Sequence, residues 1–145
     1  MHNETKFDEA RFVRQMRYHQ LGASGQLKLS QAHAAIVGCG ALGSATALSL
    51  TRAGIGRLTI IDRDVPEWSN LPRQFLFSEK DVRDGLPKAI IAERRLKEID
   101  SNVQVIPHVT HLSTHNISDL LSSVDVIVDG TDNFETRFLL NDFSC

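Results

Sequence analysis

Short apolar runs alternate along the chain with longer runs in which apolar residues return every three or four positions. The short runs predict four buried strands, at 34–37, 57–61, 103–107 and 124–128. The longer runs predict helices that follow the strands, at 41–53, 87–99, 115–122 and 133–142. Two further helical runs, at about 8–19 and 24–30, precede the first strand and lie outside this alternation.

The alternation of strands and helices predicts an α/β fold, a Rossmann-like parallel sheet with flanking helices. Strands that are joined through helices pair in parallel, with right-handed crossovers. The nearly continuous apolar run at 124–128 is typical of a strand covered on both faces. We therefore expect one main domain at 33–145, preceded by an arm of two N-terminal helices at 1–32.

A glycine-rich turn, GCGALG, joins the first predicted strand to the helix after it. Gly38 and Gly40 allow a tight turn and close approach of a phosphate, while Gly43 lets the helix pack on the sheet. The free N–H groups from Ala41 onward can bind an anion. Asp62 ends the second strand roughly 20 residues later, where a carboxylate can accept from both ribose hydroxyls. This pattern favours adenosine-nucleotide binding over a ligand-free turn, but it does not identify the nucleotide.

Three charged residues further along favour a triphosphate over a dinucleotide. Arg73 can fold back toward phosphates, and Lys88 lies in the first turn of a predicted helix, where its amine adds to the positive end of the helix dipole. Asp132 follows the fourth strand, at the edge where open α/β sheets bind ligands, and can hold Mg²⁺. Taken singly, the two cations also fit solvated surface charges, and Asp132 or Asn133 fits a helix cap. Together they favour a site for ATP and Mg²⁺.

Composition limits the partners and the location of the chain. Of its 145 residues, 41% are hydrophobic and 23% are charged, which suits a soluble globular domain. The net charge of −2 gives no reason to expect nucleic acid or an anionic membrane as a partner. No apolar run approaches the ~20 residues of a membrane span. The N-terminus is polar and the two cysteines form no CxxC pair, so we expect a reducing cytoplasm.

Several short segments along the chain form a combination that is typical of one protein family. The segments are RFVRQ at 11–15, Gly22, Gly25–Gln26, GCGALG at 38–43, DRD at 62–64, SNLPRQ at 69–74, PK at 87–88 and TDN at 131–133. Together they resemble the ThiF/MoeB/HesA adenylyltransferases, the bacterial relatives of ubiquitin-activating enzymes. The glycine motif is common to many folds, whereas SNLPRQ and TDN together are specific. Phe12 replaces the tyrosine usual in the first segment, and the resemblance runs from about Arg11 to Cys145.

The resemblance implies roles for individual residues of an ATP site. Gly40 would lie in the phosphate loop, Asp62 would bind ribose, and Asp132 would hold magnesium. Arg14 would reach a phosphate in the neighbouring subunit of a homodimer, which would give the two N-terminal helices their purpose. The other implied pocket residues, with Arg73 and Lys88 on the phosphates, are Asp64, Asn70, Arg73, Gln74 and Lys88.

The implied reaction is adenylation of a carrier protein in a pathway of the thiamine or molybdenum-cofactor type. The C-terminal carboxylate of a ubiquitin-like sulfur carrier ending in Gly-Gly would attack the α-phosphorus of ATP, and pyrophosphate would leave. The arginines, the lysine and Mg²⁺ would neutralise phosphate charge. No general base is needed because the attacking carboxylate is already ionised. Cys39 therefore fits a small filler, and His111 and His115 fit surface positions.

Full members of the family are longer than this chain. They carry a carrier-binding surface, often a catalytic cysteine on a crossing loop, and often two CxxC pairs that hold zinc. None of these is visible here, and Cys145 is simply the last residue. Zinc would belong to a missing C-terminal part, and we expect this truncated chain to be inactive alone.

Two other classes of protein stay open at this point. One is an NAD(P)-dependent oxidoreductase, which would have no use for Arg14, Arg73 or Lys88. The other is a non-catalytic fragment that binds a nucleotide or dimerises without chemistry.

Overall fold

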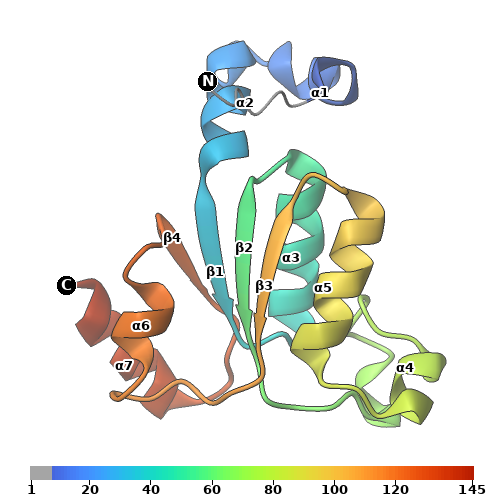
Figure 1. Ribbon diagram of the computed structural model, residues 1–145, viewed down its shortest axis with the longest axis vertical. Coiled ribbons are helices and arrows are strands. Elements are labelled where there is room, and N and C mark those ends of the chain that lie inside the picture. Colours follow the sequence, from blue (N-terminus) through green and yellow to red (C-terminus); the bar gives the residue numbers. More distant parts are fainter. Residues whose placement is uncertain (1–7) are drawn as a thin grey trace, which may run out of the picture.

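A computed structural model describes residues 8–145 and shows one parallel sheet (Figure 1). Its strands are β1 (His33–Val37), β2 (Arg57–Ile61), β3 (Gln104–His108) and β4 (Val126–Asp129), in the order β3-β2-β1-β4. Val37, at the end of β1, pairs with Ile61 of β2 and Asp129 of β4, so the strands end together at one edge of the sheet. The predicted α/β fold class is confirmed. Residues 1–7 of the predicted arm lie outside the described residues.

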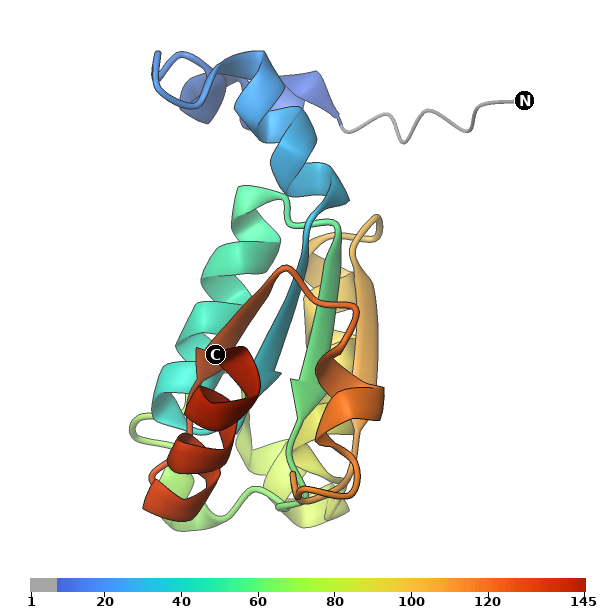
Figure 2. The ribbon, with the colours of Figure 1, turned by 90° about the vertical axis from the view of Figure 1, so that its left-hand side faces the viewer.

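Helices cover both faces of this sheet, and two more lie beyond the start of β1 (Figures 1 and 2). The described helices are α1 (Glu9–Met16), α2 (Gly22–Gln31), α3 (Ala41–Ala53), α4 (Glu79–Asp84), α5 (Lys88–Ile99), α6 (Ile117–Leu121), α7 (Phe134–Ser144) and the 3₁₀ turn η1 (Trp68–Asn70). α3 and α5 pack on one face, while α6 and α7 pack on the other. The two N-terminal helices that we expected are therefore α1 and α2.

Alternate residues of the buried strands build two separate cores. Ile36, Leu58 and Ile60 are fully buried against α3 and α5. Ile61, next in sequence, faces α6 and α7 instead. Burial on both faces explains why the strands read as continuous apolar runs. β4 is an edge strand, where Val126 is 51% exposed.

Capping residues account for some differences between the predicted and observed starts of the helices. Pro87, Asn116 and Asn133 precede their helices as N-caps, although the sequence patterns placed them inside the helices. The sequence analysis missed η1 and α4, which are too short to show helical periodicity. The sequence did carry a signal for the start of α4, because Asp81 lies three residues after Ser78. The Asp81 carboxylate accepts from both the N–H and the hydroxyl of Ser78, each at 2.7 Å.

A glutamine network anchors the N-terminal helices to the end of α3. Gln15 Nε2 and Gln26 Nε2 both donate to the carbonyl of Ala53, at 2.7 and 3.0 Å. Gln15 Nε2 also donates to Gln26 Oε1. Gly54 adopts φ +90°, and a Cβ there would lie 2.6 Å from both Gln26 and Phe12. A residue larger than glycine at position 54 would therefore push α1 and α2 away from the end of α3.

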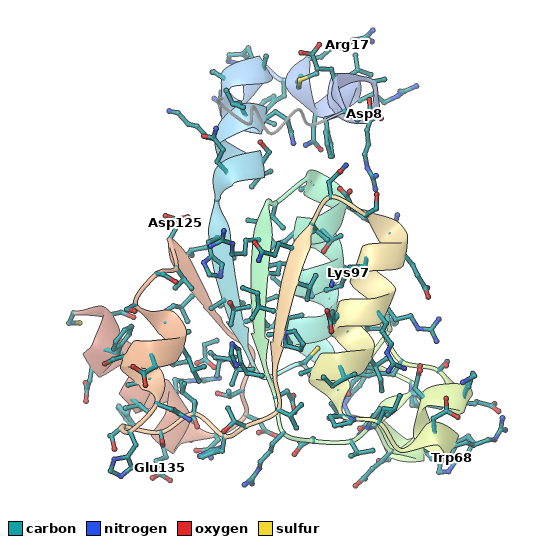
Figure 3. The ribbon with its side chains drawn as sticks, in the orientation of Figure 1. Asp8, Arg17, Trp68, Lys97, Asp125 and Glu135 are labelled. Carbon is teal, nitrogen blue, oxygen red and sulfur yellow. The ribbon has the colours of Figure 1, made fainter. Side chains whose placement is uncertain are left out.

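A second anchor joins α1 to the end of α5. Arg11 Nη2 donates to the Ile99 carbonyl at 2.5 Å, and Arg11 Nη1 lies 3.5 Å from the buried Asp100 carboxylate. Both anchors lie at the amino edge of the sheet. Figure 3 accordingly shows Asp8 and Arg17, at the two ends of α1, opposite Trp68 and Glu135 at the carboxyl edge. The N-terminal helices thus stand at the far end of the molecule from the glycine turn.

His33, the first residue of β1, is a buried titratable side chain at this amino edge. Its Nε2 lies 2.8 Å from Thr59 Oγ1, and its Nδ1 lies 3.1 Å from the Ser123 carbonyl. A carbonyl can only accept, so Nδ1 donates, and the neutral ring satisfies both contacts. Burial lowers the pKa of His33 below its ordinary value, although the Ser123 carbonyl works in the opposite direction.

We expect the free energy of unfolding to decrease as the pH falls through about 6.5, the pKa of unfolded histidine. The unfolded chain then binds a proton that folded His33 does not, so protonation favours unfolding. His33→Gln should flatten the slope of stability against pH, measured by chemical denaturation between about pH 7.5 and about pH 5.5. His115→Gln, at an exposed position, is the control. An equally steep slope in both variants would remove His33 as its source.

Candidate nucleotide site

A cavity of about 460 Å³ lies at the carboxyl edge of the sheet, where we expected the ligand. The predicted site residues that line it are Gly38, Gly40, Ala41, Asp62, Asp64, Arg73, Gln74, Lys88 and Asp132. They come from the ends of β1, β2 and β4, from the starts of α3 and α5 and from the turn after η1, so distant parts of the sequence meet here. Gly43, Asn70 and Arg14 do not line the cavity.

The glycine turn is built from close backbone contacts. Gly38 adopts φ +88°, which suits only glycine without strain. A Cβ on Gly43 would lie 1.9 Å from the Gly38 carbonyl oxygen, so Gly43 serves packing rather than contact with a ligand. A Cβ on Gly40 would approach only Gln74, at 3.7 Å, and would otherwise occupy the cavity. Gly40 therefore keeps space open for a ligand to reach the backbone.

The start of α3 points its positive end at this cavity. Gly40 is the N-cap and has no side chain that could satisfy the first N–H groups of the helix. Gly40, Ala41 and Leu42 all line the cavity. Such a helix start is a binding site for an anion.

Asp62, the predicted ribose ligand, already holds two backbone groups. Its Oδ2 accepts from the Cys39 N–H and its Oδ1 from the Asp64 N–H, both at 2.7 Å. Each carboxylate oxygen can accept a further hydrogen bond. Asp62 thus fixes the shape of the glycine turn and still presents acceptors to the cavity.

Lys88 places a buried cation in the wall of the cavity. Its side chain is 7% exposed, and its Nζ lies 3.8 Å from Asp64 Oδ2. Its own N–H donates to the Asp64 carbonyl at 2.8 Å, which fixes the start of α5. A buried ammonium at a helix N-terminus is costly without anionic partners. The arrangement therefore suits an anion larger than one carboxylate.

The turn after η1 carries Arg73 and Gln74 into the cavity. The Asn70 carbonyl accepts from the N–H groups of both, at 3.1 and 3.0 Å. The Asn70 side chain accepts from the Glu67 N–H at 3.1 Å, so Asn70 shapes the turn and does not reach the cavity. Arg73 Nη1 donates to the Ser69 carbonyl at 2.7 Å. Gln74 is buried, and its Oε1 has no hydrogen-bond partner among residues 8–145.

The turn between β4 and α7 divides its work between two neighbouring residues. Asn133 caps α7, because its side chain accepts from the N–H groups of Glu135 and Thr136 at 2.8 and 3.4 Å. Asp132 is exposed and lines the cavity. Within residues 8–145, no three His, Cys, Asp or Glu side chains are grouped to hold a metal. A single carboxylate beside anion-binding groups fits Mg²⁺, which keeps waters and phosphate oxygens as its other ligands.

The sequence analysis missed one wall of the cavity. Thr110, His111 and Leu112, which follow β3, also line the cavity. His111 is exposed, as predicted, but it is also a cavity residue. The rule that placed Asp132 at the end of β4 applies equally to the end of β3, so the signal was present.

Cys39 lies inside the glycine turn but cannot act as a nucleophile at neutral pH. Burial raises the pKa of its thiol to about 12, and the Asp62 charge adds to the effect. A thiol in this state is protonated and has no access to solvent. This supports the expectation that Cys39 is a small filler.

Arg14 lies on α1, at the opposite edge of the sheet from the cavity. Arg14 is exposed to solvent. The structure therefore does not bring Arg14 to the cavity of its own chain.

Among the described helices, none is both long and apolar enough to cross a membrane.

Comparison with known proteins identifies similar sequences and folds. The ThiF family model, described as "ThiF family", matches residues 12–145. The sulfur carrier protein ThiS adenylyltransferase of Bacillus subtilis (strain 168) is 50% identical over 132 residues, which cover 91% of this chain and 39% of that protein. The chain thus spans well under two thirds of this relative.

Solved structures give the same picture of the fold. E. coli tRNA N6-threonylcarbamoyladenosine dehydratase, TcdA, in complex with ATP matches with a TM-score of 0.79 and 28% identity, over 86% of this chain and 50% of that one. E. coli MccB with MccA-N7isoASN matches with a TM-score of 0.82 and 31% identity, over 97% of this chain and 42% of that one.

We expect two glycine substitutions to separate support of the site from access to it. Gly130→Ala would place a Cβ 2.4 Å from the Gly38 carbonyl oxygen and should destabilise the protein by about 1–3 kcal/mol. Gly40→Ala has room for its methyl group and should keep its stability while weakening ATP binding. Denaturant unfolding and equilibrium nucleotide binding measure the two effects. Wild-type ATP affinity in Gly40→Ala would contradict a backbone approach at this position.

Proposed function

The chain belongs to the ThiF family, and we propose that it forms the ATP-binding part of an enzyme that adenylates the C-terminal carboxylate of a ubiquitin-like sulfur-carrier protein. The observation that carries this proposal is the buried Lys88 ammonium in the same cavity as the glycine turn. The relative from Bacillus subtilis, an adenylyltransferase of the carrier ThiS, supports the substrate class.

The cavity offers a distinct environment to each part of ATP. Asp62 would accept from the ribose hydroxyls, and the apolar ends of β1 and β2 would lie beside the base. The start of α3 would bind phosphate oxygens through its N–H groups, with Arg73 and Lys88 adding positive charge. Asp132 would hold Mg²⁺, which would supply positive charge that offsets the charge of the leaving pyrophosphate.

The reaction would need positioning and charge neutralisation. A carboxylate oxygen of the carrier would form a bond to the α-phosphorus, and the bond from that phosphorus to the bridging oxygen of the β-phosphate would break. Pyrophosphate would leave with the electron pair of that bond. The negative charge that builds up on the phosphates would be stabilised by Arg73, Lys88 and the α3 dipole, which are fixed before the reaction begins. The acyl-adenylate is the product.

The same charges argue against the oxidoreductase alternative. A nicotinamide dinucleotide has two phosphates, not three, in the chain that joins its riboses, and it needs neutral contacts for its reacting ring. Two cations and an exposed carboxylate converge here on one cavity. The TcdA structures with ATP and with AMP have this fold. We therefore favour an ATP site.

We expect Mg²⁺ and ATP together to raise the melting temperature and NAD⁺ to leave it unchanged. A ligand that binds only the native state stabilises it by about 2.7 kcal/mol at a concentration of 100 times its Kd. Lys88→Met should lose most of the shift because the buried positive charge is gone. Lys97→Met removes an exposed lysine paired with Glu93 and should keep the shift. A shift with NAD⁺ and none with ATP would reverse the assignment.

We also propose that the full-length protein is a homodimer in which Arg14 of one subunit completes the site of the other. Arg14 stands at the amino edge of the sheet, whereas the cavity lies at the carboxyl edge, so a second copy would have to supply it. A transferred phosphoryl group with an arginine supplied in trans can react ~10³-fold faster or more. The proposed homodimer thus accounts for an exposed arginine that its own site cannot use.

Mixing two inactive variants of the full-length protein tests this arrangement. We expect Arg14→Ala and Asp132→Ala each to abolish adenylation, measured as ATP–pyrophosphate exchange with a Gly-Gly-ending carrier. In a mixed dimer, one site receives an intact Asp132 and an intact Arg14, so activity should return toward half of the wild-type sites. Arg17→Ala, on the same helix, is the matched control and should stay active. Mixed dimers that form without recovering activity would rule out a role for Arg14 across subunits.

A further inference from the structure

The carboxylate of Asp129, at the end of β4, organises the turn that carries Asp132. Asp129 Oδ1 accepts from the Thr131 N–H at 3.0 Å and from the Thr131 hydroxyl at 2.6 Å. Asp129 Oδ2 accepts from Arg137 Nε at 2.9 Å. Arg137 Nη2 also donates to the Thr131 carbonyl at 3.0 Å. One guanidinium from α7 therefore grips both the end of the strand and the residue before Asp132.

The charge state of this cluster favours a single arrangement. Burial opposes the charged form of Asp129, but the hydrogen bonds from Thr131 and the Arg137 charge outweigh it and lower the pKa of Asp129 below its ordinary value. An ionised, half-buried carboxylate needs donors on both oxygens, and Thr131 and Arg137 supply them. The fork geometry of arginine fixes direction as well as distance.

The turn between β4 and α7 also contacts the glycine turn that follows β1. The Gly130 N–H donates to the Val37 carbonyl at 2.8 Å, and the α-carbon of Gly130 lies so close to Gly38 that a Cβ would clash. The backbone from 129 to 131 is therefore held on two sides. The next side chain, that of Asp132, projects from this fixed backbone at the cavity wall.

We propose that Arg137 is a positioning residue for metal–nucleotide binding: its grip on Asp129 and on the Thr131 carbonyl holds the Asp132 carboxylate at the phosphate end of the cavity. The inference rests on the proposed function, since a nucleotide with Mg²⁺ is the ligand that requires a carboxylate there. Arg137 itself does not line the cavity and touches no reacting atom.

A purely structural role is the competing explanation. Arg137 also lies over the Phe134 ring at 5.6 Å, so it could serve only to dock α7 on the sheet. Loss of stability alone cannot separate the two roles. The discriminating quantity is the gain in ATP affinity that Mg²⁺ provides, because that gain depends on where Asp132 lies.

The chain contains a matched control in Arg95. The Asp81 carboxylate accepts from the N–H and hydroxyl of Ser78, and Arg95 Nη2 lies 3.2 Å from its Oδ2. The pKa of Asp81 is lowered in the same way, against the effect of burial, by Ser78 and Arg95. This cluster joins α4 to α5 and does not line the cavity. Arg95→Gln should therefore remove an equivalent cluster without moving Asp132.

The experiment measures ATP affinity with Mg²⁺ and with EDTA, and AMP affinity in EDTA, for the wild type and three variants. In Arg137→Gln we expect the magnesium-dependent gain to fall about tenfold or more, the range typical for loss of a group that orients a metal ligand. Arg137→Lys keeps the charge but not the fork and should retain an intermediate gain. Arg95→Gln should keep the full gain. AMP affinity should stay within about twofold in all variants.

Each result decides the matter. A magnesium gain that survives in Arg137→Gln and Arg137→Lys overturns this inference alone and leaves Arg137 as a docking residue. An equal loss in Arg95→Gln overturns it as well, because general destabilisation then explains the effect. Wild-type protein that binds ATP equally with Mg²⁺ and with EDTA, or not at all, overturns the proposed function and this inference with it. If Arg137→Gln does not fold, Arg137→Lys carries the test.

Discussion

The structure depends on three glycine backbones that meet where β1, α3 and β4 converge. A Cβ on Gly43 or Gly130 would lie 1.9 or 2.4 Å from the Gly38 carbonyl oxygen, so no other residue fits at either position without movement of the backbone. This contact brings the start of α3 against the end of the sheet and sets the turn after β4 beside it. The start of α3 and Asp132 thus line one cavity, because Gly38, Gly43 and Gly130 carry no side chains that would hold them apart.

The charged side chains around this glycine contact differ in how deeply they are buried and in what holds them in place. Lys88, the more deeply buried cation of the site, is fixed by its backbone bond to Asp64, while Asp62 accepts from the Cys39 N–H of the glycine turn and from the Asp64 N–H. Arg73 is more exposed and is held through the Ser69 carbonyl. A site with these groups in place before a ligand arrives needs little rearrangement to stabilise phosphate charge. Burial, together with the neighbouring Asp62 charge, raises the pKa of Cys39, so the thiol at the centre of the turn stays protonated.

Much of this could be predicted from the sequence, because periodicity and glycine spacing report on backbone packing. β2 and α3 have the predicted bounds, and Asp62 lies at the end of β2 where its spacing placed it. What escaped prediction depends on three-dimensional neighbours. The role of Gly130 arises from its contact with Gly38. The elements η1 and α4 are too short for a helical repeat of apolar residues to show in the sequence. Asn70 matched the SNLPRQ segment but serves the turn, since a motif gives no direction for a side chain.

The first segment of the family resemblance divides into residues that face the body of the protein and residues that do not. Arg11, Phe12 and Gln15 bind or pack at the ends of α5 and α3, so their pattern is explained within one chain. Arg14 lies on the same helix but is exposed, whereas Phe12 is buried and Gln15 is half-buried. The anchors that hold α1 in place also hold the backbone of Arg14 in place. For the proposed action of Arg14 on another subunit, a helix that is already in place leaves only the side chain to be ordered on binding, which lowers the entropic cost of the contact.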